Sequence, residues 1–398
     1  MPHRISSFLR TQKLALILLA LGLLIMGIYA GVASRNPTAI LRACGEAANK
    51  PLCYSEHIEN TLRTRGIPAA FDALAIAYDH DPGFAGTCHA LTHNLGDAAY
   101  DEFHKTGETE LTSKASYCGY GFYHGFLDAL FLDTNDLDEA RAFCTYIGQN
   151  VPHPPAPEFA EGSCYHGIGH GITDGTDPSL WGDEMRLAKP GLKLCEQVAD
   201  GNETWQMRCS TGVFNAIGNM YLDPKYKLAS DPDPYALCKK GNFAPVDEWS
   251  CYNQMNTQAA ALGNGELPAI IAYTDAIKDQ EMRLVAMKEA VSYYIQLLKH
   301  AERSLSVDEM NLCGSQPTDV LRDGCVRGLV GGVFEFGSPG QQYTEALNVC
   351  NNGTLADGLR GPCFSEVVVL TQYYFKPDVI TRVCDDIPGE YASACRSL

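Results

Sequence analysis

The sequence of 398 residues lacks the short motifs of the common nucleotide, serine-hydrolase and haem sites. It contains no G-x-x-x-x-G-K-[ST] phosphate loop, no G-x-S-x-G nucleophile turn and no C-x-x-C-H haem attachment. It also contains no C-x-x-C, the spacing that marks zinc ribbons and thioredoxin-like redox sites. These absences exclude the most common chemistries and leave histidine and aspartate as the residues to examine.

Positive charge is also scarce. The chain has 30 lysines and arginines against 48 acidic residues, a formal net charge of −18. Arg4, Arg10, Lys13 and Arg35 fall in the first 35 residues, which contain no acid, so the rest of the chain is more acidic still. An acidic surface repels phosphates and anionic lipid headgroups. We therefore expect no nucleic-acid partner.

One long apolar run is present near the N-terminus. Leu14–Ala33 is 20 residues without a charge, about the length of a transmembrane helix. Because basic residues precede it, residues 1–13 are predicted to be a cytoplasmic tail, residues 14–33 a membrane anchor and the remainder extracytoplasmic. The alternative is a signal peptide cleaved after Gly31-Val32-Ala33, which would give a secreted protein. The run exceeds the usual signal-peptide core, and this favours the anchor.

All 16 cysteines follow the apolar run, as expected for disulfides formed in an oxidising compartment. Cys118, Cys164, Cys209 and Cys251 open successive segments 46, 45 and 42 residues apart, and Cys325 and Cys363 are 38 apart. This period is typical of stacked helix pairs. The sequence therefore predicts an all-α, disulfide-stapled, solenoid-like helical-repeat ectodomain behind one transmembrane helix.

Each cysteine that ends one segment is expected to pair with the cysteine that opens the next. Such a bond closes a short loop, worth about 3 kcal/mol for about 15 residues in the chain-entropy model. The predicted pairs are 44–53, 88–118, 144–164, 195–209, 238–251, 313–325, 350–363 and 384–395. The predicted regions are N-terminal repeats at 36–262, an inserted helical hairpin at 263–312 and C-terminal repeats at 313–398.

A polar stripe recurs in the N-terminal repeats. In CYHGIGHGITD, positions two, six and ten after the cysteine are histidine, histidine and aspartate. On a helix, residues four apart lie on one face. The segments CGYGFYHGFLD and CHALTHNLGD carry related stripes, the second shifted by one residue, and later repeats lose the histidines. The stripe residues are His89, His93, Asp97, His124, Asp128, His166, His170 and Asp174.

Stacking of these helices would bring the stripes together as a metal site. Histidines at i and i+4 chelate one ion from a single helix, and the aspartates would ligate it or orient the imidazoles. All eight stripe residues are therefore candidate ligands. Imidazole and carboxylate donors suit a divalent transition metal such as zinc, iron or copper. Glycines at 121, 125, 167, 169 and 171 weaken the helices, which indicates either close backbone approach or room beside the site.

Three functions fit this pattern. The first is a membrane-anchored extracytoplasmic protein that binds one or two transition-metal ions, with hydrolysis or oxidation as its reaction. The second is metal binding or sensing without catalysis. The third is a non-catalytic scaffold whose surface binds a protein partner and whose histidines and aspartates form a buried, metal-free network. Neither H-x-x-x-H pair has a glutamate after its first histidine, so the general base of an H-E-x-x-H protease is missing. The sequence leaves catalysis and substrate open.

The anchor prediction has a direct test. The protein isolated from membranes should retain residues 1–33, because an uncleaved anchor is not processed. Intact-mass measurement of the membrane fraction would check this. A mature protein beginning at Ser34 and found in the soluble extracytoplasmic fraction would show that the segment is a signal peptide.

Overall fold

The computed structural model describes residues 39–392 and Cys395, except 86–87, 152–156, 174–176, 302, 339, 354, 356 and 376. This part of the chain is all-helical and contains no strand. The predicted anchor, residues 14–33, lies outside it. Among the described helices, none combines the length and apolar composition needed to span a bilayer.

The helices follow one another with short connections. Their bounds are α2 (Ala39–Cys44), α3 (Lys50–Arg65), α4 (Ile67–His80), α5 (Pro82–Ala85), α6 (His89–Thr106), η1 (Ser113–Ser116), α7 (Gly121–Asp133), α8 (Leu137–Asn150), α9 (Pro157–Gly171), η2 (Pro178–Leu180), α10 (Glu184–Ala199), α11 (Glu203–Met220), η3 (Pro224–Tyr226), α12 (Ala236–Lys240), α13 (Pro245–Gln254), α14 (Asn256–Leu262), α15 (Leu267–Asp275), α16 (Gln280–His300), α17 (Val307–Gly314), α18 (Asp319–Phe336), α19 (Gln342–Cys350), α20 (Asp357–Tyr374) and α21 (Pro377–Asp386).

Polar caps fix where several helices begin. Asp136, Asp183 and Asp279 each accept hydrogen bonds from two backbone N–H groups of the following helix, which are α8, α10 and α16. Ser306 forms a reciprocal capping box with Glu309 at the start of α17. A cap of this kind is worth about 1 kcal/mol. The helix boundaries are therefore set locally by the sequence.

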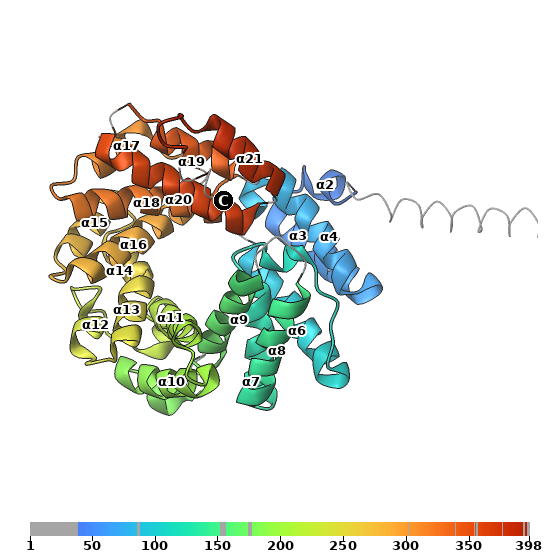
Figure 1. The fold of residues 1–398 in the computed structure, drawn as a ribbon. Helices are drawn as coiled ribbons and strands as arrows, with labels where there is room; N and C mark the ends of the chain where they lie inside the picture. Colours follow the sequence, from blue (N-terminus) through green and yellow to red (C-terminus); the bar gives the residue numbers. More distant parts are fainter. Residues whose placement is uncertain are drawn as a thin grey trace, which may run out of the picture.

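The helices are arranged in two layers around a ring (Figure 1). Helices α6, α7, α9, α11, α13, α16, α18 and α20 contact one another in that order. Most of the other helices pack on one of these, as α8 does on α9 and α10 on α11. The C-terminal helices return to the N-terminal half, where the rings of Tyr373 and Tyr374 of α20 lie 5.1 and 6.0 Å from the ring of Phe159 of α9.

All eight predicted cysteine pairings are confirmed. Six of them join consecutive helices: α2 to α3, α8 to α9, α10 to α11, α12 to α13, α17 to α18 and α19 to α20. Each of these disulfides closes a short loop and so holds two helices together. Either helix alone would bury little surface.

Two hydrophobic cores fill the space between the layers. The first extends from Ile40 to Ala286 and the second from Ala260 to Ala392. Helices α15 and α16 pack on each other within residues 263–312, and α16 contributes Ala286 to the first core and Met287 to the second. The boundaries proposed at 262 and 312 stay predictions.

Glycines let neighbouring inner helices touch through their backbones. A Cβ atom on Gly169 of α9 would lie 1.9 Å from the carbonyl oxygen of Cys209 on α11, and a Cβ on Gly212 would lie 1.9 Å from that of His166. Gly96 and Gly125 make the same reciprocal contact between α6 and α7, at 2.1 Å each. No side chain fits at these four positions. The close approach inferred from the glycine-rich sequence is thus confirmed.

The crossing of α9 and α11 yields a stability prediction. Gly169→Ala should destabilise the protein by about 1–3 kcal/mol, because the added methyl group forces two packed backbones apart. Gly358→Ala is the matched control: Gly358 also lies in a helix but has no atom within 4 Å of an added Cβ. This control should be neutral or stabilising by about 0.5–1 kcal/mol. Denaturant unfolding with the disulfides intact measures both, and equal stability of the two variants would contradict the packing argument.

Candidate metal centre

The five stripe histidines meet on the inner helices α6, α7 and α9. They form two groups, His89/His93/His124 and His124/His166/His170, and in each group one nitrogen from every ring lies within 4.8 Å of the others. His124 belongs to both groups. Its ring centroid is 5.2 Å from that of His89 and 4.4 Å from that of His170. Three helices therefore present five imidazoles to one region.

The first group is held by its outer hydrogen bonds. His89 Nδ1 lies 2.8 Å from the backbone carbonyl oxygen of Cys118. Only an N–H can donate there, so Nδ1 carries the proton and Nε2 presents a lone pair. His93 Nδ1 lies 3.4 Å from a carboxylate oxygen of Asp128, which favours the same tautomer. The two Nε2 atoms then face each other at 3.3 Å.

An unusual backbone aims the Cys118 carbonyl at His89. Cys118, Gly119 and Tyr120 have φ values of 60°, 64° and 61°, three consecutive residues in the left-handed region. Non-glycine residues adopt this conformation rarely, at a cost of about 1–3 kcal/mol each. The strain is maintained by the Cys88–Cys118 disulfide on one side and the start of α7 on the other.

Side chains of α11 orient His166 and His170 of the second group through hydrogen bonds. Thr211 Oγ1 donates to the carbonyl oxygen of Arg208 at 2.6 Å and accepts from His166 Nδ1 at 2.9 Å, which leaves His166 Nε2 with a lone pair. His170 Nε2 donates to Asn215 Oδ1 at 2.6 Å, which leaves the lone pair on Nδ1. Asn215 is fixed in turn by donating to Gln254 Oε1 at 2.8 Å. Metal-binding histidines are typically oriented by such bonds to their second nitrogen.

His124 is the histidine without such a partner. It is 5% exposed, and its Nδ1 is buried with no hydrogen-bond partner in the described structure. A buried polar atom left unsatisfied costs about 1–3 kcal/mol. The residue that carries it, His124, is the one shared by the two groups.

The protein environment disfavours the charged form of four of the clustered imidazoles, those of His89, His124, His166 and His170. Burial, reinforced by the neighbouring His93, lowers the pKa of His89 to about 4. Burial and the other histidines hold the pKa of His124 and of His166 well below the usual value, and burial lowers the pKa of His170. Neutral imidazole is the form that binds metal.

The aspartates occupy different positions. Asp128 lies beside His93, in the orienting role expected for a carboxylate next to an imidazole. Asp97 is exposed on α6 and makes no hydrogen bond or ion pair with the described histidines. Asp174 lies outside the described residues.

Sequence reasoning passed over Thr211 and Asn215, which orient His166 and His170. A signal was present: each lies 45 residues after its histidine, at the same position of the next repeat. Equivalent positions of stacked repeats face each other, so the residue that replaces a histidine in one repeat can bond to the histidine of the repeat before it.

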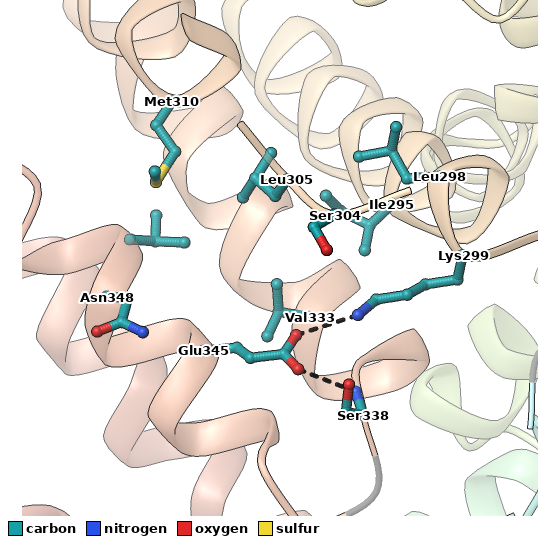
Figure 2. Close-up of a pocket in the computed structure, with 11 residues that line it drawn as sticks. Ile295, Leu298, Lys299, Ser304, Leu305, Met310, Val333, Ser338, Glu345 and Asn348 are labelled. Carbon is teal, nitrogen blue, oxygen red and sulfur yellow. Dashed lines mark hydrogen bonds and ion pairs between the residues drawn. The ribbon is translucent and has the colours of Figure 1, made fainter. Parts of the chain in front are cut away.

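A cavity of about 270 Å³ lies apart from the histidines, between α16, α17, α18 and α19. Figure 2 shows that Lys299 and the backbone N–H of Ser338 both point at Glu345, at 3.2 and 3.3 Å. Its charged groups thus satisfy each other, and apolar residues such as Leu305 and Val333 form much of the rest of its wall. This cavity offers no reactive group comparable with the histidines.

No protein-family model matches the chain, and no curated protein or solved structure is significantly similar to it. The geometry of the histidines is therefore the basis for a functional assignment.

The lowered histidine pKa values predict an acid-sensitive fold. In the unfolded chain these imidazoles take up protons near pH 6.5, whereas in the folded chain His89 does so only near pH 4. The free energy of unfolding of chelator-treated protein should therefore be highest above about pH 6.5 and fall as the pH is lowered towards 4. Denaturant unfolding across this range, with intact disulfides, measures the slope.

His124→Gln should flatten that slope, because it removes one buried imidazole. His300→Gln is the control, since His300 is exposed at the end of α16. Identical slopes for the wild type and His124→Gln would show that the cluster does not control the acid sensitivity.

Proposed function

We propose that this protein binds one or two divalent transition-metal ions through His89, His93, His124, His166 and His170. The observation that carries the proposal is the unsatisfied Nδ1 of His124, buried where two histidine triads meet. Buried polar atoms without a partner are rare in folded proteins, and one among four other imidazoles is accounted for by a missing ligand. Imidazole donors favour zinc, copper or iron.

The spacing of the nitrogens supports this proposal. Two histidine nitrogens bound to one tetrahedral zinc ion at 2.0–2.1 Å are separated by about 3.4 Å. The Nε2 atoms of His89 and His93 are 3.3 Å apart, which matches this separation. In the metal-free protein the same distance fits a hydrogen bond from one Nε2–H to the other Nε2.

The number of ions depends on His124. A single ion would take one triad. Two ions would require His124 to offer a different ring nitrogen to each, with the ring fully deprotonated. Either arrangement provides three histidine ligands and leaves a coordination position for water or substrate, as in catalytic zinc sites. Hydrolytic or oxidative chemistry is therefore compatible with the site, and we extend the proposal to a reaction of one of these two kinds.

The alternative is a metal-free polar network in a scaffold protein. The hydrogen bonds from His166 to Thr211 and from His170 to Asn215 favour it in part. They satisfy one nitrogen of each ring but leave Nδ1 of His124 buried and without a partner. A network built for structure alone would satisfy this atom, because it costs free energy when left without a partner.

The cellular setting is part of the proposal. We infer a solenoid-like ectodomain that faces an oxidising, extracytoplasmic compartment, anchored by residues 14–33. The eight disulfides support the oxidising compartment. The apolar run with basic residues before it supports the anchor. In the alternative scaffold function, the outer helices would bind a protein partner.

Metal analysis tests the site. The full chain, produced in an oxidising compartment and loaded separately with zinc, copper or iron, should retain one or two ions per chain by mass spectrometry. His124→Gln should lose all bound metal, because both triads depend on it. The pair His89→Gln/His93→Gln and the pair His166→Gln/His170→Gln should each lose one ion if two are bound.

The control is His80→Gln/His300→Gln, which removes two exposed histidines outside the cluster and should keep the full metal content. Circular dichroism of every variant shows whether the fold is retained. Folded wild-type protein that retains none of the three metals would rule out the metal site and leave the polar network as the explanation.

A further inference from the structure

A row of hydrogen bonds leads from His170 to the next inner helices of the ring. His170 Nε2 donates to Asn215 Oδ1 at 2.6 Å, and Asn215 Nδ2 donates to Gln254 Oε1 at 2.8 Å. Gln254 Nε2 donates in turn to Asn253 Oδ1 at 2.5 Å. Side chains thus link α9, α11 and α13, which follow one another around the ring (Figure 1). We call Asn215, Gln254 and Asn253 the amide chain.

The amide chain ends at a carboxylate. Helix α13 packs on α16, and Asn253 donates a hydrogen bond to Glu289 of α16. Asn253 is 6% exposed, so this end of the chain is shielded from water. Burial raises the pKa of Glu289, whereas Lys288 and Arg208 oppose this effect by favouring the ionised carboxylate.

Every donor in the row points towards Glu289. A side-chain amide has an acceptor and a donor, so a row of amides can be oriented in either direction. In the reversed direction, Asn253 would present its carbonyl oxygen to Glu289, and two acceptors would meet. An ionised carboxylate can only accept, so Glu289 excludes the reversed direction.

The direction of the row decides which nitrogen of His170 carries the proton. His89 and His166 carry theirs on Nδ1, because a backbone carbonyl and a threonine hydroxyl that already donates elsewhere can only accept from them. His170 faces an asparagine, which by itself can accept from an imidazole or donate to it. In the reversed direction Asn215 would donate to Nε2, and the proton would move to Nδ1.

We propose that Glu289 is a positioning residue for the second histidine group and acts on His170 through the amide chain. It aligns the three amides with their donors towards α16, holds the proton of His170 on Nε2 and leaves Nδ1 to bind a ligand. Aligned hydrogen bonds strengthen one another, and a carboxylate behind an imidazole makes it a better metal ligand. The positioning of His170 needs no metal; only its effect on metal affinity rests on the proposed function.

Nuclear magnetic resonance of the histidine rings tests the proposal. The full chain in detergent, with heavy nitrogen in its histidine rings, is treated with a chelator and measured at about pH 8, where imidazoles are neutral. The shifts of the two ring nitrogens show which one carries the proton, and His170→Gln identifies the signals of His170. The wild type should show His170 predominantly in the Nε2–H form.

Replacement of the carboxylate should release the amide chain. Glu289→Gln keeps the size of the side chain but can donate as well as accept, so both directions become available. The ratio of the Nδ1–H form to the Nε2–H form of His170 should rise about fivefold, the factor that corresponds to one hydrogen bond. Gln254→Met cuts the chain without changing a charge, and it should raise the ratio as well if Glu289→Gln disturbs the fold.

A rescue variant separates positioning from support of the fold. Adding Gln254→Glu to Glu289→Gln moves the carboxylate closer to Asn215, which can then only donate to it. The ratio should return to the wild-type value. Gln258→Met is the matched control and should leave the ratio unchanged, because Gln258 is a buried glutamine that donates to the carbonyl oxygen of Gly218, outside the amide chain.

Zinc affinity gives a second measurement. In the His89→Gln/His93→Gln background only the second histidine group remains, and competition with a chelator measures its affinity. Adding Glu289→Gln should weaken zinc binding about tenfold, as is typical when the partner behind a histidine ligand is removed. Adding Gln258→Met should not change it.

The outcomes are distinct from those of the metal proposal. An unchanged ratio in both Glu289→Gln and Gln254→Met, an equal change in Gln258→Met, or no rescue by Gln254→Glu would overturn the role of Glu289. A changed and rescued ratio in a protein that binds no metal would refute the proposed function alone and leave the positioning of His170 by Glu289 established.

Discussion

The structure depends on the backbone-to-backbone crossing of its inner helices. Gly169 and Gly212 bring α9 and α11 so close that each added Cβ would strike the carbonyl of the other helix, and Gly96 and Gly125 do the same for α6 and α7. Short side chains such as threonine and asparagine can then reach across to imidazoles of the next helix. A helix pair separated by ordinary side chains, at 8–10 Å between axes, would hold these groups too far apart for the hydrogen bonds observed.

The disulfides and the crossings have complementary roles. Five of the disulfides join an outer helix to an inner one, whereas the glycines set the distance between neighbouring inner helices. Together they fix a ring of short helices that lack long uninterrupted apolar faces. The hydrophobic cores lie between the two layers of helices and not in the interior of the ring. The inner stripe can therefore consist of polar residues.

Along the inner stripe, the chemistry changes from repeat to repeat on a constant scaffold. Histidines occupy it on α6, α7 and α9, then Thr211 and Asn215 on α11, and Glu335 on α18. Arg208 of α11 lies near the proposed metal centre, and its guanidinium carbon is 5.8 Å from the centre of the Phe159 ring on α9.

Local spacing in the sequence determined the helical class, all eight disulfides and the five clustered histidines. These follow from short-range rules: a cysteine at each helix end closes the nearest loop, and residues four apart share a helix face. Tertiary structure alone decided which histidine nitrogen is free, that His124 is shared and unsatisfied, and that Asp97 does not join the cluster. It also brought Tyr120 and Tyr374 to the same ring of Phe159, since closing the ring joins residues more than 200 positions apart, and no local pattern encodes that contact.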